Sequence, residues 1–160
     1  MRRAVLRLAL PLLALLAQPL AAETAVVAVA DRASSSSATA MSFGDALNAF
    51  RAQHGRGALA EDRALSRAAQ SYAEAMAAGG FFSHVGPDGS NVATRARAAG
   101  CRGRGYYAEN IAWGQRTASD SFNGWAASSG HRANMLGRPY GVFGLGQASG
   151  YWVLMFADGC

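Results

Sequence analysis

The feature that most constrains the fold of this chain is a stripe of small and apolar side chains within residues 62–78. The stripe follows the three- and four-residue spacing of a buried helix face and consists of Leu65, Ala68, Ala69, Tyr72 and Met76. Alanines on that face allow a second layer to approach the helix backbone closely. The pattern therefore predicts a helix that packs against another layer and ends at the glycine pair 79–80.

The end of the chain has strand-like character. Residues 142–145 and 151–156 are apolar and aromatic, and the turn-forming segment 148–150 joins them, so they predict a β-hairpin. Gly141, Gly144 and Gly146 weaken the strand propensity and indicate close approach of a neighbouring backbone or a bulge. Helices that precede a terminal antiparallel hairpin predict an α+β fold.

Start and stop signals predict three further helices. Ser42 begins the first, with Asp45 completing a capping-box-like pattern, and Gly55 ends it. Ser90 can cap a short helix that ends before residue 100, and Thr117 opens another helix.

The segments between these helices are expected to be irregular. Residues 81–90 are predicted to form a turn-rich loop that Phe81 and Phe82 anchor in the core. Residues 103–114 are bounded by glycines, and we expect irregular backbone near a strand there. We also expect a loop around His131.

The first 22 residues have the order of a secretory signal peptide: three arginines, an apolar run over residues 8–16, and small residues up to Ala22. An uncleaved anchor is the alternative, but the run is shorter than the roughly 20 residues that a membrane span needs. Residues 23–41 are expected to be a flexible leader, and residues 42–160 the folded domain. We therefore expect a secreted or periplasmic protein without a transmembrane span after cleavage.

Charge and cysteine content agree with export. Twelve of the 15 arginines and all 10 acidic residues follow the predicted cleavage site, which leaves a net charge of +2. This small excess gives no basis for nucleic-acid binding, and we expect none. In an oxidising compartment Cys101 and Cys160 predict a disulfide, with two free thiols as the alternative. We also expect a monomer.

The concentrated polar chemistry of the chain lies in His84, Glu109 and His131, each in a turn-rich segment. Two neutral imidazoles and a carboxylate can supply three zinc ligands, with water in the fourth position. The long spacing between the three residues is weak evidence for a metal site, because no His-Glu-x-x-His helix is present. A serine nucleophile is disfavoured, because no Gly-x-Ser-x-Gly elbow is present.

Structural roles for the same residues stay open. His84 can simply hydrogen-bond its own loop, and His131 can cap the end of a helix. Glu109 can pair with Arg132 or Arg51 and hold two layers together. Such a paired carboxylate has a perturbed pKa without taking part in catalysis.

Several motifs, in this order, resemble those of the bacterial secreted branch of the CAP (SCP-like) superfamily. The matching segments are Phe82-Ser83-His84, Glu109-Asn110-Ile111-Ala112, Gly130-His131-Arg132, Asn134-Met135-Leu136 and Tyr151-Trp152-Val153. The resemblance extends over residues 43–157 and implies a three-layer α-β-α sandwich with a central antiparallel sheet. Two positions depart from the family pattern: Ser128 stands where eukaryotic members often have a second glutamate, and Ser129 where many bacterial relatives have proline.

The resemblance also implies a shallow cleft that in some members binds zinc or another divalent cation, with His84, Glu109 and His131 at the matching positions. It does not fix a reaction. Our first hypothesis is an extracellular binding module for a lipid or a cell-envelope component, with no catalytic residues. The alternatives are a metal-dependent, peptidase-like hydrolase that uses the same cleft, and an interaction protein whose cleft has no role.

Overall fold

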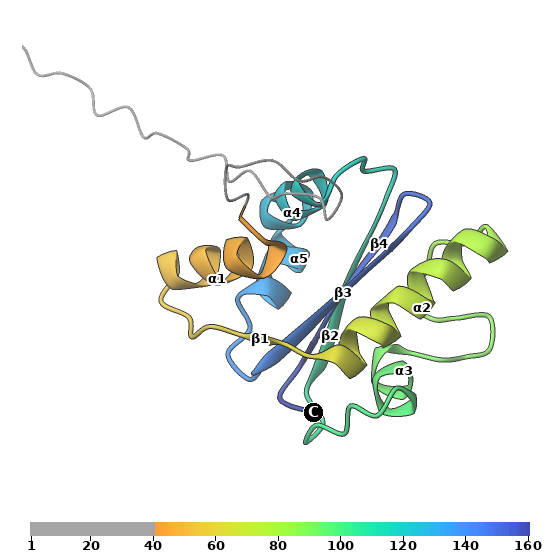
Figure 1. Ribbon diagram of the computed structural model, residues 1–160, viewed down its shortest axis with the longest axis horizontal. Helices are drawn as coiled ribbons and strands as arrows, with labels where there is room; N and C mark the ends of the chain where they lie inside the picture. The colour runs from red at the N-terminus through yellow and green to blue at the C-terminus, as the bar shows by residue number, and fades with distance from the viewer. Residues whose placement is uncertain (1–40) are drawn as a thin grey trace, which may run out of the picture.

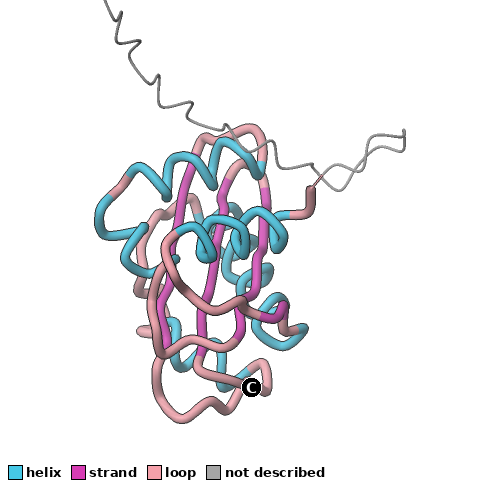
Figure 2. Tube along the Cα trace, turned by 90° about the vertical axis from the view of Figure 1, so that its left-hand side faces the viewer, coloured by secondary structure: helices cyan, strands magenta, loops and turns pink. Residues whose placement is uncertain are grey.

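The computed structural model describes residues 41–160. The predicted signal peptide, residues 1–22, and all but the last residue of the predicted leader, residues 23–41, lie outside the described residues. The described part forms three layers, with a β-sheet between two groups of helices (Figure 1, Figure 2). This arrangement confirms the predicted α+β class and the α-β-α sandwich.

The sheet of the described region has four strands in the spatial order β1-β3-β4-β2. They are β1 (Ala60–Glu61), β2 (Tyr107–Trp113), β3 (Val142–Ala148) and β4 (Tyr151–Ala157). The strands β3 and β4 form the predicted hairpin, β2 pairs with β4 in the antiparallel sense, and the short β1 runs parallel to β3. Strand β2, which carries Glu109, is therefore at an edge of the sheet.

Helices cover both faces of the sheet (Figure 1). One face is covered by α1 (Phe43–Gln53), α4 (Ala118–Ala127) and α5 (Ser129–Met135), and the other by α2 (Arg63–Gly79) and α3 (Val92–Ala98). Successive side chains of β4 point to opposite faces, as in any strand. Leu154 and Phe156 join the core under α1 and α4, whereas Val153 and Met155 join the core under α2.

The alanine stripe of α2 packs directly on β3, the layer that the sequence analysis left unnamed. A Cβ atom on Gly144 would collide with the backbone of Ser66, and one on Gly146 with the backbone of Gln70. The helix and the strand are thus too close for any side chain larger than hydrogen at these two positions. Alanines on the helix and glycines on the facing strand allow this contact, and the sequence analysis marked each set separately as a place of close approach.

The predicted helix starts are largely correct. Ser42 and Asp45 form a reciprocal capping box at α1, and Asp62 caps α2. The helix α2 ends at Gly80, whose φ of 63° is left-handed and therefore favours glycine. The cap of α3 is Asn91, one residue after the predicted Ser90.

Two segments that we expected to be irregular are regular. Strand β2 forms within residues 103–114, because β4 offers it a partner over seven consecutive residue pairs. The segment around His131 is the helix α5. It has no side-chain cap at its start, and Arg51 donates to the carbonyl of Met135 at its end over 2.7 Å. These tertiary partners leave no periodic signal in the local sequence.

The loop anchor is also partly different from the prediction. Phe81 packs against the core under α2, but Phe82 is 50% exposed. The predicted disulfide between Cys101 and Cys160 is present and ties the chain end to the segment before β2. In the chain-entropy model, such a crosslink contributes about 4 kcal/mol to stability. Within residues 41–160, no helix has the length and apolar character that crossing a membrane requires.

Candidate functional site

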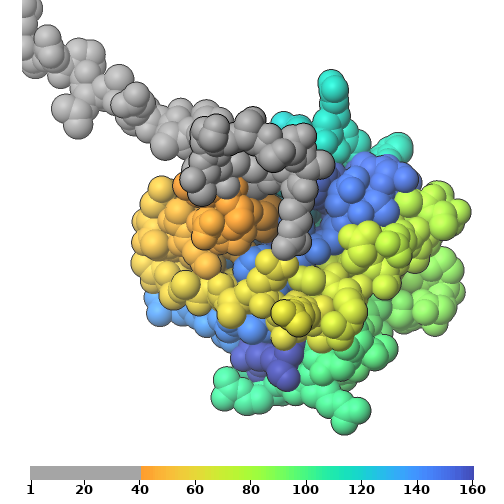
Figure 3. All heavy atoms as spheres, in the orientation of Figure 1, coloured from red at the N-terminus to blue at the C-terminus, as the bar shows by residue number. Residues whose placement is uncertain are grey.

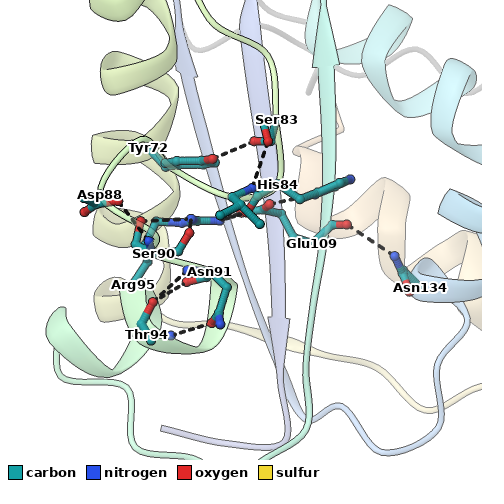
Figure 4. A network of polar contacts seen from close by, with 11 residues as sticks. Tyr72, Ser83, His84, Asp88, Ser90, Asn91, Thr94, Arg95, Glu109 and Asn134 are labelled. Atoms are coloured by element: carbon teal, nitrogen blue, oxygen red, sulfur yellow. Dashed lines mark hydrogen bonds and ion pairs between the residues drawn. The ribbon is translucent and has the colours of Figure 1, made fainter.

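Glu109 is the centre of a polar network at the edge of the sheet (Figure 4). Its side chain projects from β2 toward α3 and is only 2% exposed. One carboxylate oxygen, Oε1, accepts a hydrogen bond from Nδ1 of His84 over 2.9 Å, and the other, Oε2, accepts one from Nη2 of Arg95 over 2.8 Å. Both oxygens of this buried carboxylate are therefore paired with protein donors.

Arg95 joins the loop before α3 to Glu109. Its Nη1 donates to the carbonyl of Ser90 over 2.8 Å, and its Nη2 also donates to the carbonyl of His84 over 3.1 Å. The guanidinium carbon lies 3.4 Å from the centre of the Tyr72 ring, which is cation–π geometry. The Tyr72 hydroxyl in turn donates to the carbonyl of Ser83 over 2.6 Å. The loop that carries His84 is thus fixed by both α2 and α3.

His84 presents one ring nitrogen to solvent. Its side chain is 56% exposed, although Nδ1 is bound to the buried Glu109. A ring whose Nδ1 carries the proton has Nε2 as a free acceptor, so the carboxylate sets which nitrogen is available for a ligand. Sequence analysis placed His84 and Glu109 in one cleft, and the structure brings them into direct contact.

His131 lies on α5, in the opposite helical layer. Burial lowers its pKa below the ordinary value of 6.5, and the positive charge of His84 lowers it further. A positive charge on His84 opposes a positive charge on His131, so a neutral His131 is favoured.

Two asparagines hold α5 against the edge strand. Asn110, fully buried, donates to the carbonyl of His131 over 3.0 Å. Asn134 donates to Oδ1 of Asn110 over 2.9 Å and to the backbone carbonyl of Glu109 over 3.3 Å. Because Glu109 and Asn110 are adjacent in a strand, their side chains face opposite layers, and β2 positions both halves of the cleft.

The metal prediction meets a specific difficulty. Within residues 41–160, no group of three His, Cys, Asp or Glu side chains is arranged to hold an ion. The two oxygens of Glu109 are engaged by His84 and Arg95, so the donors as arranged do not fit a three-ligand site. Coordination by His84, Glu109 and His131 stays a prediction.

The partner of Glu109 is one that sequence analysis missed. Arg51 donates to backbone carbonyls of Gly57 and Met135, and Arg132 donates to Nε2 of His54, so neither holds the carboxylate. Arg95 does, from a helix too short to show which face is buried. The sequence did contain one signal for this partner: an arginine on the short predicted helix that lies between His84 and Glu109 in the chain.

A cavity of the described region lies on the α2–α3 side of this network. It has a volume of about 870 Å³. Its wall includes the alanine-rich side of α2, the short helix α3 and the loop that carries His84, with Tyr72, Ser90 and Arg95 among the lining residues. Arg95 thus lies between the cavity and Glu109.

The structure is the disulfide-linked α-β-α sandwich that the sequence predicted, with His84 bonded to an ion-paired Glu109 at the edge of its sheet. The class of protein is therefore a small α-β-α domain. The chain belongs to the cysteine-rich secretory protein family, CAP, whose family model matches residues 45–156.

Solved bacterial structures share the fold. An extracellular protein with an SCP domain from Bacillus anthracis is 25% identical with a TM-score of 0.69, over 72% of this chain and 38% of that one. An outer surface protein from Borrelia burgdorferi is 16% identical with a TM-score of 0.62, over 72% of this chain and 88% of that one. A cysteine-rich secretory protein from Staphylococcus aureus is 17% identical with a TM-score of 0.61, over 72% of this chain and 36% of that one. This chain thus spans well under half of the Bacillus and Staphylococcus proteins.

No curated protein matches the chain.

Proposed function

We propose that this protein is an extracytoplasmic binding module that holds a lipid or a cell-envelope component over its histidine cleft. The order of charged, apolar and small residues in the first 22 positions supports export. The similar proteins from Bacillus and Borrelia are described as extracellular and outer-surface proteins, which supports the same compartment for this chain.

The observation that carries the proposal is an exposed apolar surface beside the cleft. Phe82 and Val85 flank His84 and are 50% and 55% exposed, and Trp113, at the end of the strand that carries Glu109, is 61% exposed. The Tyr151 ring lies 6.4 Å from the Phe82 ring and 5.8 Å from the Trp113 ring, so the three rings form one group. Exposed aromatic side chains grouped around a polar cleft are typical of binding surfaces.

This aromatic group (Phe82, Trp113 and Tyr151) is rigidly mounted. Trp113 and Tyr151 are cross-strand neighbours in the β2–β4 pair, and their rings are stacked at 28°. The nearby end of the β3–β4 hairpin, in blue, lies at the molecular surface beside the C-terminal half of α2 (Figure 3). A rigid apolar surface loses little conformational entropy when a ligand covers it.

The hydrolase alternative has less support. A peptidase-like mechanism needs a carboxylate or imidazole that can take a proton from water. Glu109 is buried, and its two oxygens accept hydrogen bonds from His84 and Arg95, which leaves it poorly placed to take a proton from water. A binding role requires no such base.

Intrinsic fluorescence tests the proposal, because Trp113 is the exposed tryptophan of the described region. Trp125 and Trp152 are 1% and 6% exposed, so a ligand that covers the aromatic group changes mainly the Trp113 emission. The purified mature protein is titrated with soluble peptidoglycan fragments and, separately, with phospholipid vesicles. We expect a saturable blue shift with one of them, and at least tenfold weaker binding for His84→Ala.

A matched control and a turnover assay complete the experiment. Trp113→Phe removes the optical signal but keeps an aromatic ring, so binding measured by co-sedimentation should persist. The proposal is wrong if neither material changes the emission or co-sediments. It is also wrong if the protein cleaves peptide or ester substrates and His131→Ala abolishes that turnover.

A further inference from the structure

The buried carboxylate of Glu109 needs a compensating positive charge. An ionised group that is 2% exposed is costly in the protein interior unless a cation and hydrogen bonds replace the lost water. Two side chains reach it within 2.9 Å: His84 at one oxygen and Arg95 at the other.

Of these two, Arg95 is the permanent cation. A guanidinium stays protonated throughout the physiological range, whereas an imidazole also has a neutral form. The Arg95 side chain is 10% exposed, compared with 56% for His84. Burial strengthens the attraction between the guanidinium and the carboxylate, because little water screens it.

Arg95 is also locked in position by groups other than Glu109. The carbonyls of Ser90 and His84 accept hydrogen bonds from its two terminal nitrogens, and the Tyr72 ring lies under the guanidinium. Moving Arg95 away from Glu109 would break these contacts and leave the buried carboxylate without its cation. The ion pair is therefore part of the folded structure and not an adjustable surface contact.

We propose that the guanidinium of Arg95 is the resident cation of the cleft, so that Glu109 orients His84 and does not coordinate a divalent ion. The groups that face a ligand are then Nε2 of His84 and the imidazole of His131. An ion that binds the wild-type protein finds two imidazoles and no carboxylate. Arg95 thereby determines that the cleft favours a neutral or hydrogen-bonding ligand over tight metal binding. This inference rests on the proposed function only in treating the cleft as a ligand site.

Zinc affinity, measured by competition with a chromogenic chelator, tests this inference without any substrate. For the wild type we expect weak binding that depends on His131 and changes less than twofold in Glu109→Gln. Arg95→Gln frees a carboxylate oxygen, so zinc should bind at least tenfold more tightly, and Arg95→Gln/Glu109→Gln should lose that gain. Arg97→Gln, which removes the same charge from an exposed position of α3, is the matched control and should leave zinc affinity unchanged.

A measurement on the unaltered protein keeps the test decisive if a variant fails to fold. Nitrogen-15 spectra of the imidazoles distinguish the two ring nitrogens. With zinc added, the Nδ1 proton of His84 should persist, because it remains bonded to Glu109, while Nε2 shifts.

Two results would overturn the inference. One is a wild-type zinc site that Glu109→Gln weakens as strongly as His131→Ala does. The other is loss of the His84 Nδ1 proton on zinc binding. Neither result bears on whether peptidoglycan or lipid binds, which the Trp113 titration decides separately.

Discussion

The sharpest stability prediction concerns Asn110, the buried asparagine of β2 that bonds α5. In Asn110→Ala, the carbonyl of His131 loses its side-chain donor over 3.0 Å, and the amide of Asn134 loses one of its two acceptors over 2.9 Å. A buried polar group that loses its partner costs about 1–3 kcal/mol, and a group that keeps a second partner costs less. We therefore expect the free energy of unfolding to fall by about 2–4 kcal/mol, which for a domain of this size lowers the melting temperature by roughly 10 °C.

Chemical denaturation measures that loss, and the titration of His131 shows where it acts. The pKa of His131 is lowered mainly by burial, so releasing α5 from β2 should raise it toward its ordinary value. Asn48→Ala is the control. Asn48 also makes two side-chain hydrogen bonds, but both go to the backbone of Leu59 and not to α5. It should lower stability without changing the titration of His131.

The reasoning would be refuted by an Asn110→Ala variant that loses less than about 1 kcal/mol, the net worth of one ordinary hydrogen bond. It would equally be refuted if both alanine variants changed the His131 titration to the same extent. In either case α5 would be held to the sheet by apolar packing alone.

Three further predictions follow from the fold and the site. Because the pKa of His131 is lower in the folded state, the unfolded state binds more protons as the pH falls below 6.5. The free energy of unfolding should therefore decrease below pH 6.5. In His131→Gln, denaturation measured against pH should show a smaller decrease over the same range. Cys160→Ser should lower the free energy of unfolding by about 4 kcal/mol or less, measured in urea, and an unchanged midpoint would contradict the crosslink's role. Gly146→Ala should lower the melting temperature far more than Gly124→Ala, because a Cβ at position 146 meets the backbone of Gln70 whereas one at position 124 meets nothing within 4 Å.

The layers of the fold were predictable because their signals are local. The sequence analysis marked the stripe of α2 and the glycines of β3 separately as places of close packing, and the structure shows that they form one contact. The start of α1 was predictable for a similar reason, since a capping box lies within four consecutive residues. Such features depend on neighbours in the chain and need no knowledge of the tertiary structure.

Strand β2 and helix α5 were missed because their support comes from elsewhere in the chain. Seven residue pairs with β4 hold β2, and Asn110 and Arg51 bind the backbone of α5. A short segment with weak intrinsic preference takes the structure that its tertiary partners favour. The same dependence explains why Phe82 was expected in the core: its apolar character was visible, but the absence of a partner layer at that position was not.

In the candidate site, the sequence located the residues but did not reveal what each of them is bonded to. The motifs correctly marked His84 and Glu109 as neighbours, but three donor residues in a family pattern say nothing about which of them are already paired. That depends on Arg95, which reaches Glu109 from α3 and meets it in a buried setting. A carboxylate beside an ion and a carboxylate beside a guanidinium carry the same charge and have different chemistry. The first donates electrons to its ion, whereas the second, in our proposal, orients the imidazole next to it. The function of a histidine cleft in such a domain therefore depends as much on the buried arginine behind the glutamate as on the histidines in front of it.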